Sequence, residues 1–234
     1  MKKFILFLLI YPSFTFAQVD ILSVLEASLV KIAILLPDNK IISKGTAFFI
    51  ENDSTLISAA HVYVKAEDAL ISIRKGAIVA LRYSRQNKLL YAVPITPHKV
   101  NYAYDLVSFK VNPKLIKSKC KDCEITPLLL ASNNPIAGES ILLFGYYGSD
   151  KFPIVLKSII SGSVNLKTNQ TVTELLVDKI VNSGQSGGPI LSETSMKLVG
   201  IILSTIRIKV DDEIQSGISR GAAVESIRQF LSKH

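Results

Sequence analysis

A serine in a glycine-rich loop is the feature of this sequence that points most directly to chemistry. The loop runs from Asn182 to Pro189 and reads Asn-Ser-Gly-Gln-Ser-Gly-Gly-Pro, with Ser186 near its centre. Glycines let consecutive backbone N–H groups turn toward one point, where a developing oxyanion would be stabilised. A serine hydroxyl is a poor nucleophile at neutral pH, so it needs a base, and the base needs an orienting partner.

His61 and Asp105 are the candidates for these two roles. His61 ends the run Ser-Ala-Ala-His, and Asp105 opens the run Asp-Leu-Val. A lone histidine after an apolar run is usually an ordinary polar group, and an aspartate at the start of a strand is often a turn residue. The Ser186 loop in the same chain gives both a catalytic interpretation. Asp53 and Asp68 are weaker rivals, because the first fits a turn and the second lies among charged neighbours.

Short apolar, β-branched runs separated by turn residues predict an all-β protein around these residues. The expected strands of the first half are 29–36, 45–50, 54–58, 70–73, 77–83, 89–95 and 106–111. Those of the second half are 128–130, 140–144, 154–164, 175–177, 190–191, 198–205 and 216–219. Two halves of similar strand number predict two six-stranded antiparallel β-barrels in tandem.

The end of the chain has a different pattern. Val224, Ile227 and Leu231 have the spacing i, i+3 and i+7, which predicts a C-terminal amphipathic α-helix packed on the second barrel. The expected organisation is a signal peptide, an N-terminal barrel, a lysine-rich interdomain linker and a C-terminal barrel with its helix, over residues 1–17, 18–111, 112–125 and 126–234.

The N-terminal segment has the pattern of an export signal. Lys2 and Lys3 precede an apolar run, and Thr-Phe-Ala ending at Ala17 is a small-residue cleavage site. Cleavage there would leave Gln18 as the first residue. The alternative is an uncleaved anchor, but the apolar run is shorter than the ~20 residues of a spanning helix and Pro12 interrupts it. We therefore expect an exported protein, periplasmic or secreted, without a stable membrane anchor after cleavage.

The net charge is positive, but the charges are dispersed. Without the signal segment there are 25 Lys and Arg against 19 Asp and Glu, so the net charge falls from +8 to +6. Such a surplus permits attraction to anionic surfaces. No tight basic run interleaved with aromatics is present, and a solvated surface is the better interpretation. Nucleic acid is not an expected partner.

Cys120 and Cys123 form the pattern Cys-x-x-Cys. Export favours a local disulfide between them, with free thiols as the alternative. A redox pair of this spacing normally opens a helix in a βαβ setting, which the strand pattern does not provide. Zinc would need two more ligands, and only His98 and His234 are spare. We expect no metal and no cofactor.

Several stretches together resemble the trypsin-like (chymotrypsin-fold) serine peptidases, closest in style to the bacterial Deg/HtrA-type protease domain. The Ser186 loop and the strand end at His61 are specific, and the other stretches are weak singly. The matching stretches, which cover most of the chain in the right order, are 45–50, 56–61, 105–107, 138–145, 158–162, 181–189 and 198–201.

The resemblance implies a role for each candidate residue. His61 would be the general base, Asp105 its orienting carboxylate and Ser186 the nucleophile, in a cleft between the barrels. The backbone N–H groups of Gly184 and Ser186 would form the oxyanion hole. The resemblance implies a protein or peptide substrate, and we expect a monomer.

Two departures from the family pattern are visible. Position 185 is Gln, whereas the digestive members have an Asp that pairs with a newly cut N-terminus. We infer an enzyme competent without that switch. The peptide-binding PDZ domain typical of full Deg proteases is also expected to be missing after the catalytic part.

The resemblance places a primary substrate pocket at Ile180, Ser204, Thr205 and Gly217. Ile180 falls where trypsin-type specificity has an acid, so no preference for Lys or Arg is expected. A modest apolar side chain is the expected substrate residue. Two arginines near the pocket leave an acidic preference open, namely Arg207 and Arg220.

The predicted function is that of an exported serine endopeptidase acting through an acyl-enzyme. The alternative is a catalytically inactive trypsin-like homologue that serves as a binding module. An esterase is disfavoured although 184–188 match Gly-x-Ser-x-Gly, because that motif belongs to an α/β fold with the order Ser, acid, His. Only His234 follows Ser186 here.

Overall fold

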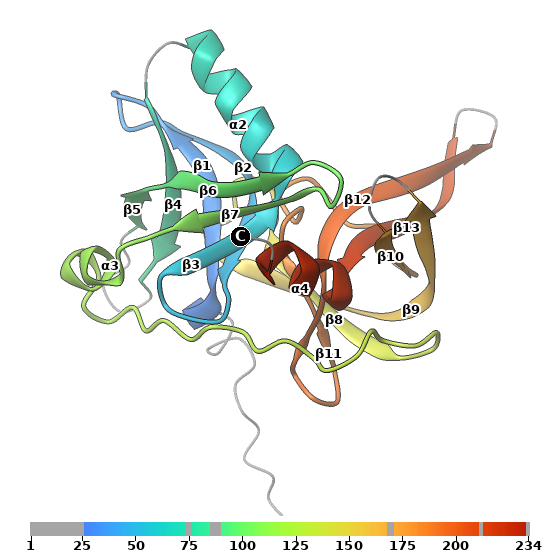
Figure 1. Ribbon diagram of the computed structural model, residues 1–234. Helices are drawn as coiled ribbons and strands as arrows, with labels where there is room; N and C mark the ends of the chain where they lie inside the picture. The colour runs from blue at the N-terminus through green and yellow to red at the C-terminus, as the bar shows by residue number, and fades with distance from the viewer. Residues whose placement is uncertain (1–25, 74–75, 85–89, 168–170, 211–212, 233–234) are drawn as a thin grey trace, which may run out of the picture.

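The computed structural model describes residues 26–73, 76–84, 90–167, 171–210 and 213–232. The predicted signal peptide, 1–17, lies outside these residues. In the described part of the chain, the β-branched runs form two sheets that lie side by side, each built from one half of the chain (Figure 1). The predicted all-β class with a C-terminal helix is confirmed.

The first sheet has seven strands in the spatial order β5-β4-β1-β2-β3-β7-β6, and all neighbours are antiparallel. It has one strand more than the six predicted, because residues 96–101, which lie outside the expected strands, form β6 and pair with β7. The strands are β1 (Leu29–Leu35), β2 (Ile41–Phe49), β3 (Thr55–Ala59), β4 (Ala77–Tyr83), β5 (Leu90–Pro94), β6 (Thr96–Asn101) and β7 (Leu106–Lys110).

A helix that the sequence analysis missed leaves the first sheet directly after β3. This helix, α2 (Ala60–Ile73), includes residues 70–73, which were wrongly predicted as a strand. Its buried residues Val62 and Ala66 are four apart, as on one face of a helix. That spacing, continued by the partly buried Leu70, overrides the β-branched character of its last turn. In Figure 1, α2 stands against the first sheet beside β1 and β2.

The second sheet is a closed barrel with the strand order β10-β13-β12-β11-β8-β9, as the six-strand prediction required. After it, α4 (Val224–Ser232) packs against β12, β13 and β10. The strands are β8 (Ser140–Tyr146), β9 (Pro153–Lys167), β10 (Thr171–Val177), β11 (Pro189–Ser192), β12 (Leu198–Val210) and β13 (Glu213–Ala223).

The connection between the halves contains a short helix, α3 (Pro113–Lys119), within the predicted linker 112–125. Asn112 caps it, since its Oδ1 accepts from the backbone N–H of Lys114 at 3.0 Å, and proline stands at the first helical position. Cys120 and Cys123 follow the helix and form a disulfide. The predicted strand 128–130 makes only single bridges, one to Ile50 in the first half and one to Leu198 in the second.

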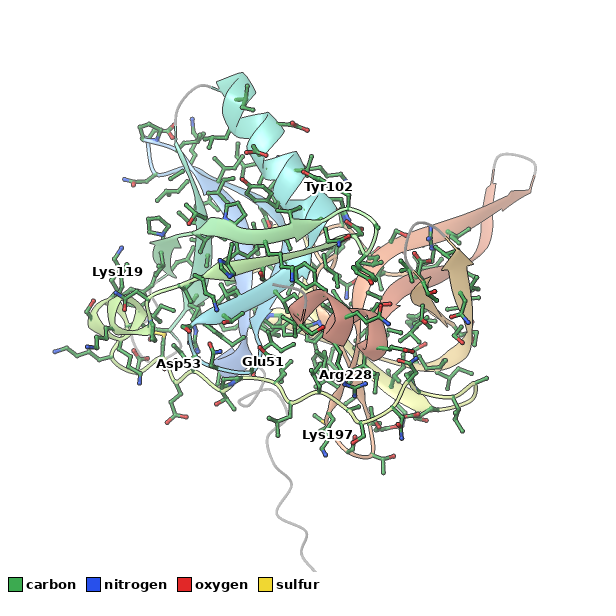
Figure 2. All side chains as sticks on the ribbon, viewed as in Figure 1. Glu51, Asp53, Tyr102, Lys119, Lys197 and Arg228 are labelled. Carbon is green, nitrogen blue, oxygen red and sulfur yellow. A yellow bond between two sulfur atoms is a disulfide. The ribbon has the colours of Figure 1, made fainter. Side chains whose placement is uncertain are left out.

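β8 separates two hydrophobic cores. Ile141 and Leu143 point into the closed barrel, whereas Leu142 and Phe144 pack in the cluster that fills the first half. Side chains of a strand alternate between faces, so one strand can serve both cores. The first cluster also contains Phe230 of α4. In Figure 2, side chains fill the space around α4, and Arg228 points toward the connecting segment, where it donates to the Ala131 carbonyl.

Within the described residues, none of the helices combines the length and the apolar character needed to span a membrane.

Candidate active site

His61 and Asp105 form a closely bonded pair at the edge of the first sheet. His61 lies in the first turn of α2, and Asp105 lies in the turn before β7. The Nδ1 atom of His61 is 2.7 Å from Oδ2 of Asp105, and Oδ1 of Asp105 accepts the backbone N–H of His61 at 2.9 Å. The Asp105 carbonyl also accepts the N–H of Ala60 at 2.9 Å. The carboxylate therefore fixes both the helix start and the imidazole ring, and leaves Nε2 as the free nitrogen of the ring.

The turn that carries Asp105 holds that residue in a left-handed backbone conformation, with a φ of 51°. Aspartate tolerates this region better than most residues, and the three hydrogen bonds to α2 compensate for the strain. Asn101 stabilises the turn from the other side, because its Oδ1 accepts the N–H groups of Ala103 and Tyr104. Tyr102, labelled in Figure 2, is on the same turn and largely exposed.

The C-terminal helix holds this turn from the second half of the chain. Tyr104, the neighbour of Asp105, is buried, and its hydroxyl donates to Oε1 of Gln229 on α4 at 2.8 Å. Lys99 on β6 donates to the carbonyl of Phe230 at 2.5 Å. A lysine at the C-terminal end of a helix satisfies a free carbonyl and complements the helix dipole. The position of Asp105 thus depends on both halves.

The nucleophile loop lies in the second half, between β10 and β11, and its glycines are required by close packing. A Cβ on Gly187 would lie 2.1 Å from Oγ of Ser58 and 2.2 Å from the carbonyl oxygen of Thr46. Gly187 also has a φ of 83°, in the region that favours glycine. Here the loop contacts β2 and β3 of the first half, which brings Ser186 to the first sheet.

Two peptide groups of the loop are fixed through their carbonyl oxygens. Ser183 O accepts from the N–H of Gly148 at 3.2 Å, and Gln185 O accepts from the N–H of Gly188 at 2.9 Å. In a trans peptide the N–H points opposite to the C=O. The N–H groups of Gly184 and Ser186 are therefore directed away from these contacts. Within the described residues, neither of these two N–H groups has a backbone or side-chain acceptor.

Gln185 supports the loop from inside. Its side chain is fully buried, and its Oε1 accepts the backbone N–H of Asn182 at 2.8 Å. The N–H of Gln185 in turn donates to the Asn182 carbonyl at 3.1 Å. The loop is closed by bonds between residues three positions apart. No ion pair is needed at position 185 for this arrangement.

Thr46 on β2 connects the loop to both halves of the chain. Its Oγ1 donates to the carbonyl of Gly184 at 2.7 Å and accepts the N–H of Tyr146 at 2.9 Å. Its backbone N–H donates to the Ser186 carbonyl at 2.9 Å. A buried threonine with all of these bonds satisfied fixes the loop relative to β2 and β8.

Ser186, His61 and Asp105 line one cleft of about 1000 Å³ between the two halves. The Ser186 hydroxyl donates to the carbonyl of Leu203 on β12 at 3.2 Å. No hydrogen bond between Ser186 and His61 occurs among the described residues. The structure thus brings the three predicted residues to one cleft and directs the serine hydroxyl toward β12.

A family model for the trypsin-like peptidase domain matches residues 45–201, about two thirds of the chain. The chain belongs to the trypsin-like peptidase family. The match includes the end of β2 from residue 45, all of α2, the turn of Asp105 and the whole loop 182–189.

Individual relatives of this trypsin-like peptidase are distant. Serine protease HTRA4 of Mus musculus is 24% identical over 203 residues, which are 82% of this chain and 34% of that protein. Serine protease HTR4 of Rattus norvegicus has the same identity and coverage. The chain spans about a third of the length of these relatives.

Two solved structures illustrate the similarity of the fold. The active form of Rv3671c protease from M. tuberculosis has a TM-score of 0.62 and 18% identity, over 89% of this chain and 81% of that chain. Deg5 has a TM-score of 0.61 and 16% identity, over 87% of each chain. At this identity the two structures show the common fold.

Of the four residues predicted for the substrate pocket, two line the cleft and two do not. Ser204 and Thr205 line the cleft together with Val181 and Leu203. Ile180 and Gly217 are not among the cleft-lining residues but lie against each other, because a Cβ on Gly217 would be 3.0 Å from the Ile180 side chain.

The two arginines near the pocket differ. Arg220 is held by Glu174, with its Nε and Nη2 atoms 2.6 and 2.5 Å from the carboxylate oxygens. That ion pair removes Arg220 from the residues that would bind an acidic substrate. The side chain of Arg207 lies outside the described residues.

One group of His, Cys, Asp or Glu side chains among the described residues has the spacing of a metal site, namely Cys120, Asp122 and Cys123. Its two sulfur atoms are joined in the disulfide.

Sequence reasoning did not find the residues that support the site. Thr46 and Ser58 lie in stretches that resemble the family, but their hydroxyl groups had no signal of function. Gln185 was noted only for its departure from Asp. Lys31 on β1, described below, is a single lysine in an apolar strand, and that contrast was the available signal.

Proposed function

We propose that this trypsin-like peptidase is an exported serine endopeptidase with a His61–Asp105–Ser186 triad. The observation that carries the proposal is the 2.7 Å contact between His61 Nδ1 and Asp105 Oδ2 in the cleft that also contains Ser186. A carboxylate at Nδ1 leaves Nε2 free to act as the base toward a serine. The family of the chain, and the printed names of its relatives, support hydrolysis of peptide bonds.

The proposed reaction begins when the Ser186 hydroxyl turns from Leu203 O toward Nε2 of His61. As Oγ attacks a peptide carbonyl, His61 takes the proton and Asp105 stabilises the resulting imidazolium. The N–H groups of Gly184 and Ser186 donate hydrogen bonds to the carbonyl oxygen and stabilise the negative charge that develops on it. His61 then protonates the leaving amine. Water attacks the acyl-enzyme, with His61 again as base, and frees Ser186.

The residue before the cleaved bond would lie against Val181 and the edge formed by Leu203 to Thr205. These walls are apolar apart from two hydroxyl groups, and Arg220 is already paired. We therefore propose a preference for a modest apolar side chain. The substrate itself would be a protein or an extended peptide.

The test is to treat the chain from Gln18 onward and its Ser186→Ala variant with a fluorophosphonate probe, alongside cleavage of casein. A peptide blocked at both ends separates endopeptidase from exopeptidase action. The proposal predicts labelling of the wild type alone and cleavage of the blocked peptide. Losing Ser186 or His61 should lower kcat by about 10⁴-fold or more, as in triad knockouts.

The alternative, an inactive homologue that binds peptides, is favoured by the bond of the Ser186 hydroxyl to Leu203 O. A serine held in that orientation would not be labelled. A folded protein that binds casein without labelling and without cleavage would support this alternative and overturn the triad proposal.

A further inference from the structure

The loop between β8 and β9, residues 147–152, is attached to the first sheet by a buried lysine. Lys31 on β1 is 6% exposed, and its ammonium donates to the carbonyl of Gly148 at 3.1 Å and to that of Asp150 at 2.6 Å. It also lies 5.3 Å from the ring centre of Tyr146. Lysine is rarely buried without a compensating partner. Here the partners are backbone atoms of the other half of the chain.

The same loop contacts the nucleophile loop through Gly148. The Gly148 N–H donates to Ser183 O at 3.2 Å. Ser183 O belongs to the peptide group that carries the N–H of Gly184, one of the two proposed oxyanion donors. Because that group is planar and trans, the contact to its oxygen sets the direction of its N–H. If Gly148 moved away, the peptide would lose the bond that opposes its rotation.

Other contacts of the loop involve the Tyr83 ring of β4. The ring of Phe152 packs edge-on against it with 4.8 Å between the ring centres, and Nζ of Lys151 lies 5.7 Å from the centre of the same ring. Such contacts retain the loop near β4 but do not fix the orientation of a peptide at Gly148. Gly148 itself is exposed and has a φ of 51°, so its conformation is not determined by packing. The two bonds from Lys31 supply the directional restraint.

We propose that Lys31 is a positioning residue for catalysis, which keeps the Gly184 N–H directed into the oxyanion hole by holding Gly148 against Ser183. The inference rests on the proposed function and adds a residue of β1 that touches neither the substrate nor the triad. It assigns the chemistry of the oxyanion hole to both halves of the chain.

A cavity beside Lys31 makes a sharp test possible. It has a volume of about 290 Å³, and Lys31, Ile41, Leu81 and Tyr83 are among its walls. This space can accommodate a longer guanidinium at position 31, which can donate to the same carbonyls. Lys31→Arg is therefore the rescuing variant and Lys31→Met the disrupting one. Lys110→Met is the control for the loss of a lysine from the first sheet, because Lys110 donates its side-chain bond to Thr55, at 2.9 Å, within that sheet.

The experiment measures kcat and KM of the wild type and these three variants on one peptide substrate, normalised to active sites titrated with a fluorophosphonate. The inhibition constant of a peptide aldehyde, whose adduct carries an oxyanion, is measured alongside. Loss of one oxyanion donor costs about 10²–10³-fold in kcat. A displaced donor should cost less, so we expect kcat of Lys31→Met to fall about 10–100-fold with little change in KM. Aldehyde affinity should fall in parallel, and Lys31→Arg should recover most of the loss.

A second pair of variants addresses the risk that Lys31→Met does not fold. Replacing Gly148 by its α-hydroxy acid analogue, glycolic acid, gives an ester that lacks the N–H donor to Ser183 but can keep the φ of 51°. Gly148→Asn keeps the donor in a residue that tolerates a left-handed φ. The expected result is a fall in kcat for the ester variant alone, at a melting temperature close to that of Gly148→Asn.

Equal kcat per titrated site in Lys31→Met and Lys110→Met, or in the Gly148 ester variant and Gly148→Asn, would overturn the inference while wild-type activity still supports the proposed function. An inactive, unlabelled wild type would instead overturn both.

Discussion

The two sides of the cleft differ in how many of the hydrogen bonds needed for the proposed triad are already formed. On the first-half side, Asp105 is bonded to the ring and the backbone of His61 and to the backbone of Ala60. On the second-half side, the nucleophile loop is fixed at its carbonyls, but the Ser186 hydroxyl is bonded to Leu203 O. The proposed base is thus preformed, whereas the side chain of the proposed nucleophile, Ser186, has one rotation to make. Strain is concentrated at Asp105, where three hydrogen bonds support it, and freedom remains at the serine side chain.

On the first-half side of the cleft, the largest loss of activity is expected from a change of the Asp105 carboxylate. Asp105→Asn preserves the shape of the side chain, and asparagine tolerates the left-handed backbone of this position. Its amide would favour the wrong tautomer of His61, so kcat at neutral pH should fall by about 10⁴-fold. Steady-state kinetics with a peptide substrate measures this effect. Retention of full activity would contradict the role of Asp105, and an unchanged melting temperature serves as the control for folding.

On the second-half side, the hydrogen bonds that hold the Ser186 loop can be removed at Thr46. Thr46→Val keeps the volume but removes the hydroxyl that bonds Gly184 O and the Tyr146 N–H. Two buried groups would lose their partner, which should lower the free energy of unfolding by about 1–3 kcal/mol. Urea denaturation measures the loss. Thr46→Ser, which keeps the hydroxyl, should be closer to the wild type, and equal losses in both variants would show that the methyl group matters instead.

The contribution of α4 to the preformed side should be smaller. Tyr104→Phe removes the bond to Gln229 and leaves the ring in place. A typical hydrogen bond contributes about 0.5–1.5 kcal/mol, and we expect a two- to fivefold fall in kcat from a looser Asp105 turn. Gln229→Leu should have a similar effect, and the double variant should be no worse than either single one. Additive losses in a double-mutant cycle would show that the two side chains act independently.

The smallest expected effect concerns the stability of the region around Lys31 at alkaline pH. Burial lowers the pKa of the Lys31 ammonium, while the Asp150 carboxylate opposes that shift. Between the lowered pKa and the ordinary lysine pKa, the unfolded chain binds more protons than the folded one, so stability from this group rises with pH. The free energy of unfolding of the wild type should therefore rise relative to that of Lys31→Met as the pH increases across this window. Parallel pH curves for the two proteins would contradict it.

Much of the fold was accessible from the sequence because strand periodicity is local. Residues 77–83 were predicted as a strand and form β4 with the same bounds, and the helix at Val224–Ser232 followed from its apolar stripe. The errors came from segments in which the residue types favour one secondary structure and the contacts with the rest of the fold favour another. Residues 70–73 include the β-branched Ile71 and Ile73, yet they continue a helix that begins ten residues earlier. Residues 96–101 contain Pro97 and His98, yet β7 supplies a partner strand.

The candidate triad was accessible because its three members occur in recognisable short runs. Their supports were not, because Thr46, Gln185 and Lys31 act through backbone atoms that are distant in sequence. A threonine that bonds residues 100 and 138 positions away leaves no local pattern. The pairing of Arg220 with Glu174 also depends on the register of β10 and β13, which the sequence alone does not determine.

The sharing of β8 between two cores has a consequence for the newly made chain. The cluster that fills the first half includes Leu142 and Phe144 of β8 and Ile227 and Phe230 of α4. A growing chain that has produced only the first sheet lacks these side chains, and the Asp105 turn lacks Gln229. We therefore expect an unfinished molecule to lack the complete cleft, so that the proposed peptidase activity arises only once α4 has been added. Under the proposed function, the order of the chain would protect against premature proteolysis.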